Sequence, residues 1–80
     1  MKYFDVTIYY SLKIGEAYQY GEIHFHVVIA LDEATAAAIA AFKLSLGDIK
    51  QQVTINSVEV IEQVAKDESQ QRYFDREGLR

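Results

Sequence analysis

The sequence contains no cysteine and no proline, and it has no long apolar run. Without cysteine, a disulfide framework, a thiolate metal site and thiol-dependent catalysis are all excluded. Nowhere do about 18 apolar residues follow one another, as a membrane span requires. Residues 1–12 alternate in polarity instead of forming the apolar region of a signal peptide. We therefore expect a soluble, untargeted protein of the reducing cytoplasm.

The size and composition predict one small globular domain covering residues 1–80. Half of the 80 residues are hydrophobic and 25% are charged, which is far from the composition of disordered chains. The 12 acidic and 8 basic residues give a net charge of −4, which disfavours attraction to phosphate backbones. We expect no nucleic-acid partner and no membrane partner.

Two neighbouring segments alternate apolar and polar residues with the period of a β-strand. Apolar side chains occupy the even positions of residues 4–14 and the odd positions of residues 23–31. Gly15 lies between the two segments and suits the first central position of a type II′ turn, because that position requires φ > 0. We therefore predict a β-hairpin.

The turn sets the register of the hairpin. Pairing Ile14 with Ala17 makes the numbers of all paired residues sum to 31, so that Phe4 faces Val27 and the two apolar faces coincide. Gly21 falls opposite Tyr10 in this register. It marks either a bulge or a place where the Tyr10 ring lies over bare backbone.

The period changes in "LDEATAAAIAAFKLSLGD", which predicts a helix of about 13 to 15 residues. Asp32 is the expected N-cap and Gly47 the expected C-cap. Ile39, Phe42 and Leu46 are expected to press on the apolar face of the hairpin. The alanines allow a close approach to the sheet or mark a second contact surface, although alanine is also the best helix former.

A third strand is predicted in residues 51–64, followed by a polar C-terminal segment, residues 63–80. The apolar phase of the strand switches at Asn56-Ser57, which predicts a bulge there. A terminal helix is expected over residues 63–77. The resulting fold is α+β, ββαβ(α), with a three-stranded, mainly antiparallel sheet of order 2-1-3, one helix on one face and a C-terminal helix.

The outer face of the predicted sheet carries most of the candidate functional residues. In the expected register Asp5 lies opposite His26, Thr7 opposite His24 and Tyr9 opposite Glu22. The candidate interface comprises Tyr3, Tyr9, Tyr18, Tyr20, His24 and His26, and Val28 is expected on the same face. One interpretation is an ordinary exposed face, since tyrosine and threonine favour strands. A second is a protein interface, where tyrosines supply large contact areas.

A third interpretation is a metal or ligand site. Histidines two apart on a strand point the same way, and Glu22, His24 and His26 together offer ligands used by zinc and non-haem iron. A flat strand, however, keeps alternate Cα atoms about 6 to 7 Å apart and supplies no pocket wall.

No motif of a catalytic site is present. The chain has no glycine-rich phosphate loop, no G-x-S-x-G and no H-E-x-x-H sequence, so we expect no enzyme and no cofactor. We therefore expect a small protein-interaction module that is homodimeric through its tyrosine-rich outer face or an edge strand. The alternative is a dimeric protein that binds a small ligand or metal through His24 and His26.

Overall fold

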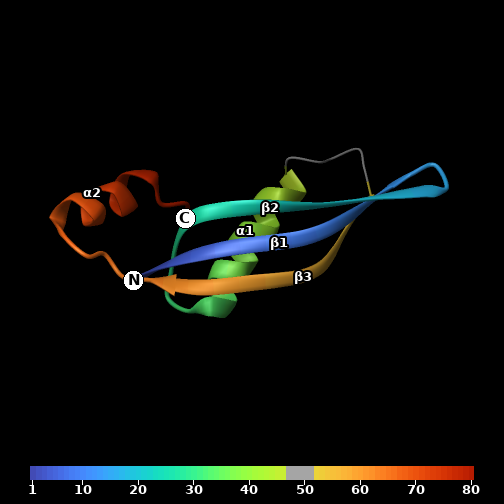
Figure 1. Ribbon diagram of the computed structural model, residues 1–80. Coiled ribbons are helices and arrows are strands. Elements are labelled where there is room, and N and C mark those ends of the chain that lie inside the picture. Colours follow the sequence, from blue (N-terminus) through green and yellow to red (C-terminus); the bar gives the residue numbers. More distant parts are fainter. Residues whose placement is uncertain (47–51) are drawn as a thin grey trace.

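The computed structural model of the chain describes residues 1–46 and 52–80 (Figure 1). The elements in chain order are β1 (Lys2–Ile14), β2 (Ala17–Ala30), α1 (Glu33–Leu46), β3 (Gln52–Gln63) and α2 (Glu68–Glu77). The sheet has the order β2-β1-β3, and both of its pairings are antiparallel. The predicted ββαβα fold of the α+β class is therefore confirmed. No helix among the described residues is long and apolar enough to cross a membrane.

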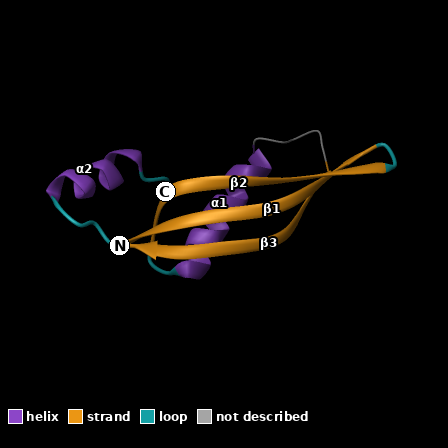
Figure 2. Cartoon of the chain, in the orientation of Figure 1, coloured by secondary structure: helices purple, strands orange, loops and turns teal. Residues whose placement is uncertain are grey.

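The hairpin forms as the sequence predicts. Gly15 has φ +62°, while no described residue other than glycine has a positive φ, which matches a type II′ turn. The predicted register holds from Ile14–Ala17 to Val6–Phe25. Figure 2 shows that the turn of the hairpin projects beyond the other elements. The part of the chain that the structure describes measures 49 × 18 × 18 Å along its principal axes.

The predicted register is wrong at the other end of the hairpin, because β2 contains a bulge. The pairing shifts between Phe4 and Val6, so that Phe4 pairs with Val28 and not with Val27. Val28, expected on the outer face, is fully buried in the inner core. The bulge turns Val27 and Ile29 toward the outer side, where they form a second cluster.

The inner core lies between the sheet and α1, with Phe4, Val6, Ile8 and Val28 fully buried. Ala36 and Ala40 are the helical residues that are fully buried against this layer, and Ile39 is partly buried beside them. The predicted contact through Phe42 is wrong, because 62% of this residue is exposed. Small side chains face the sheet and allow close packing. The Leu46 side chain and the predicted C-cap Gly47 lie outside the described part.

α1 and α2 each begin directly after an aspartate that caps the helix N-terminus. Asp32 caps α1 as predicted, since its Oδ1 accepts a hydrogen bond of 2.8 Å from the backbone N–H of Thr35. This bond holds the pKa of Asp32 below its usual 3.8. Asp67 caps α2 in the same way, accepting from Gln70 N–H at 2.8 Å. The terminal helix therefore begins at Glu68 and not at residue 63, which still belongs to β3.

Two features of the chain from Asn56 onward complete the fold: a bulge in β3 and the docking of α2 on the outer side of the sheet. The predicted bulge in β3 is confirmed, since Tyr9 pairs with Ser57 and Tyr10 with Ile55, which leaves Asn56 unpaired. Phe74 of α2 is buried against Val27 and Ile29 on the outer side. α2 thus lies at the end of the sheet opposite the hairpin turn (Figure 1).

Candidate functional site

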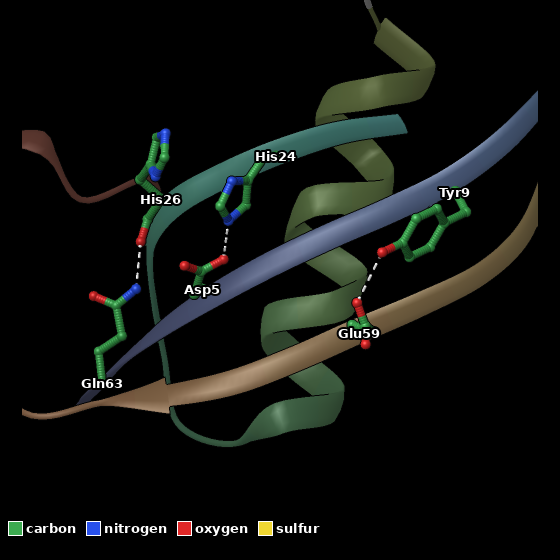
Figure 3. Close-up of polar contacts among 6 residues, drawn as sticks. All are labelled: Asp5, Tyr9, His24, His26, Glu59 and Gln63. Atoms are coloured by element: carbon green, nitrogen blue, oxygen red, sulfur yellow. Dashed lines mark hydrogen bonds and ion pairs between the residues drawn. The ribbon is translucent and has the colours of Figure 1, made fainter. Parts of the chain in front are cut away.

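The outer face of the sheet divides into three parts. At one end α2 covers Tyr3, whose ring lies 5.1 Å from that of Phe74. In the middle stand Asp5, His24 and His26 (Figure 3). At the hairpin end Tyr18 and Tyr20 are 58% and 75% exposed.

The middle part brings together two histidines and one carboxylate. The Nε2 atom of His24 contacts Asp5 Oδ1 across the β1–β2 pairing, and the ring centroids of His24 and His26 lie 4.3 Å apart. One ligand atom from each of the three residues lies within 4.8 Å of the others. The sequence predicted Asp5 opposite His26. The β2 bulge breaks that pairing, and the Asp5 carboxylate contacts His24 instead.

The backbone at the bulge is held by a side chain from the far strand. Gln63 Nε2 donates a hydrogen bond of 2.8 Å to the carbonyl oxygen of His26, as Figure 3 shows. A bulge leaves backbone groups outside the regular ladder, and such groups need another partner. Gln63 supplies one and fixes the position of His26.

Tyr9 takes part in a separate polar pair. Its hydroxyl donates a hydrogen bond of 2.9 Å to Glu59 Oε2 on β3 (Figure 3). This bond and the negative charge of Glu59 favour the neutral phenol, so the pKa of Tyr9 is raised above its usual 10.0. Glu22 pairs with Tyr9 across β1–β2 as predicted, but it does not belong to the group around the histidines.

Tyr3 is tied to α2. Its hydroxyl donates a hydrogen bond of 2.5 Å to Asp75 Oδ1 and accepts one from Gln71 Nε2. The bond to Asp75 is the main reason why the pKa of Tyr3 is raised above 10.0. Among the six predicted interface residues, Tyr3 is thus the one held beneath the C-terminal helix.

A cavity of about 330 Å³ adjoins the histidines. His24 and His26 line it together with Tyr73 and Glu77 of α2, with Leu79 just after α2, and with Lys43 of α1. The sequence predicted no wall around the histidines. The wall was missed because it comes from residues about 50 positions away, which the β2 bulge and α2 bring to this place.

The edge strand β3 is a further candidate surface. Three of its large apolar residues, Ile55, Val58 and Ile61, are exposed. The predicted phase of this strand placed Ile55 and Val58 on its inward face and did not single out Ile61. Their exposure follows from the position of β3 at the sheet edge, which the predicted strand order 2-1-3 already implies.

Comparisons with protein-family models, with curated proteins and with solved structures found no match to this chain.

Proposed function

We propose that the protein is a small non-enzymatic interaction module that forms a homodimer by pairing the outer edge of β3 with β3 of a second copy. The observation that carries this proposal is the apolar surface of that edge strand. Ile61 is 63% exposed, and Ile55 and Val58 are exposed as well. Exposed apolar side chains along an unpaired strand favour pairing with another chain.

The exposed side chains stand on both faces of β3. Val58 pairs with Ile8, which faces the inner core, whereas Ile61 pairs with Asp5 on the outer face. Strands of an antiparallel sheet normally keep polar residues on the solvated face and apolar residues on the face that packs on the core. Ile61 departs from this pattern, whereas Ser57, Glu59 and Gln63 on the same face of β3 follow it.

The two edges of the sheet are treated differently. The edge of β2 is occupied near its end, because Leu79 N–H donates to Val27 O at 3.0 Å and Leu79 O accepts from Ile29 N–H at 2.7 Å. Among the described residues, no strand pairs with the outer edge of β3. Nor does Gln52–Gln63 contain lysine or proline, which often protect edges from association.

Antiparallel pairing of β3 with its own copy is compatible with the charges of the strand. Glu59 and Glu62 are its charged residues. Like charges directly opposite each other are destabilising. A twofold axis at Val58 or at Val60 would place neither glutamate opposite its counterpart, and such an interface closes with two subunits.

Light scattering after size-exclusion chromatography of the untagged protein, in buffer with a chelator, tests the proposal. The wild type is expected to be a dimer. Ile61→Lys is expected to shift it to monomers, because lysine on each copy would bring charge into the apolar contact. Tyr20→Ser is the matched control: it changes an exposed ring on β2, which β1 separates from β3, and it should leave the dimer intact.

The opposite result would identify a different interface. A dimer that survives Ile61→Lys and dissociates with Tyr20→Ser would place the contact on the tyrosine-rich outer face and exclude β3. A monomeric wild type at high concentration would reject the homodimer altogether.

We assign the module to the cytoplasm, because a chain that needs no disulfide suits a reducing compartment.

A further inference from the structure

We propose that Asp5, His24 and His26 form a binding site for a divalent transition-metal ion of the zinc type. The three side chains come from β1 and β2 and stand on one face of the sheet (Figure 3). Their nearest ligand atoms lie within 4.8 Å of one another. A single ion with metal–nitrogen and metal–oxygen bonds of about 2 Å can span atoms at such separations with small side-chain adjustments.

The ligand types decide which ion fits. Two imidazoles and one carboxylate are a common set for zinc and for non-haem iron. Calcium and magnesium are held by oxygen ligands, so the two histidines disfavour them. Three protein ligands leave a coordination position for water or a small ligand.

The bulge in β2 gives the site its geometry. In a regular strand, residues two apart have Cα atoms about 6 to 7 Å from each other. The rings of His24 and His26 nevertheless approach to 4.3 Å between centroids, tilted by 50°. The hydrogen bond from Gln63 to the carbonyl of His26 holds the backbone on which this approach depends. The side chains are thus placed before an ion arrives.

The surroundings also suit an ion. His24 and Asp5 are partly exposed, so an ion can enter from solvent. The adjoining cavity of about 330 Å³ is lined by both histidines and by the carboxylate-bearing Glu77, and it has room for water or a small molecule beside the ion. Binding would replace the direct contact between His24 and Asp5 by two bonds to the metal.

Calorimetric titration of the untagged, chelator-stripped protein with zinc chloride tests the site. The expected result is one zinc ion per chain. His26→Ala and Asp5→Asn should each weaken zinc binding by about tenfold or more, since changes even in groups behind the ligands cost about 10- to 100-fold. Glu22→Gln is the matched control: it removes a carboxylate two residues from His24 that lies outside the group, and it should bind zinc like the wild type.

Cobalt(II) serves as a spectroscopic probe of the ligands. Its visible absorption is expected to be strong with the wild type and to be lost with His26→Ala. Circular dichroism of each variant tests whether the fold is retained. Wild-type protein that binds no zinc, or variants His26→Ala and Asp5→Asn that bind it unchanged, would overturn the proposal. Zinc binding that only Glu22→Gln weakens would do the same.

The site is independent of the proposed dimer, and the two can be tested apart. Ile55→Lys changes β3 at a position that pairs with Tyr10, away from Asp5, and leaves the three ligands in place. This variant is expected to bind one zinc ion per chain whether or not it is monomeric. Loss of zinc binding in correctly folded Ile55→Lys would contradict a site contained within one chain.

Discussion

Gly78 lies directly against Ile29, and this contact sets how closely the C-terminal segment approaches the sheet. A Cβ atom added at Gly78 would lie 2.2 Å from Ile29 Cδ1 and 2.6 Å from the carbonyl oxygen of Phe74. Gly78 N–H also donates to that carbonyl at 2.8 Å and closes the last turn of α2. A residue with a side chain therefore cannot occupy the position unless backbone moves.

Gly78→Ala is accordingly expected to lower the free energy of unfolding by about 1 to 3 kcal/mol, the usual cost of overpacking. Urea denaturation of the purified variant measures it. Gly21→Ala is the control, because its added Cβ would meet only the tip of the Tyr10 ring, at 2.8 Å, which can turn aside. An equal or larger loss for Gly21→Ala would contradict this account.

The alanine face of α1 provides a second prediction. Ala40 is fully buried against the sheet, so Ala40→Leu should lose about 1 to 3 kcal/mol through overpacking. Ala38→Leu adds the same atoms to the exposed side of the helix and should change stability by less than about 0.5 kcal/mol. Denaturation midpoints of the two variants measure this difference. Equal shifts would contradict the close packing of Ala40 against the sheet.

Phe74 is the residue that anchors α2. It is 4% exposed, and it packs with Val27 and Ile29. Phe74→Ala is expected to cost roughly 3 kcal/mol, the lower end for such truncations, because this cluster is small. Hydrogen exchange should show the amides of α2 losing protection while β1 keeps its own. Tyr73→Ala truncates the neighbouring, exposed ring and should leave α2 protected.

Asp32 makes stability depend on acidic pH. Because the folded pKa lies below its usual 3.8, the ionised N-cap stabilises the protein above the unfolded pKa. That contribution is lost as the pH falls through the folded pKa. Asp32→Asn keeps a capping oxygen without titrating. Denaturation between about pH 2 and pH 6 should show the advantage of the wild type shrinking toward low pH; a difference that stays constant would exclude this linkage.

The hairpin, the Asp32 N-cap and the β3 bulge depend on local sequence, which is why most of the fold could be predicted. Gly15 allows the positive φ that its turn requires. The phase switch at Asn56-Ser57 is visible because the apolar residues move from odd positions, Val53 and Ile55, to even positions, Val58 and Val60. The β2 bulge has no such signature. After His26 the chain reads Val-Val-Ile-Ala, which is apolar in either phase, so alternation cannot reveal the slip.

The inward side of α1 escaped prediction for a similar reason. Its 14 residues include six alanines spread around the helix, so no polar stripe fixes its rotation. We assigned the larger side chains to the core, but space between helix and sheet admits Ala36 and Ala40 and leaves Phe42 outside. The grouping of Asp5 with the histidines could be anticipated only in part, because it depends on the same bulge.

The docking of Phe74 and Leu79 on β2 has a consequence during protein synthesis. Val27 and Ile29 receive their cover from residues made about 45 to 50 positions later. While β3 is still being synthesised, the hairpin and α1 can already assemble, but the apolar side chains of Val27 and Ile29 are exposed to water. The nascent chain is therefore most prone to aggregation in the interval before α2 emerges from the ribosome.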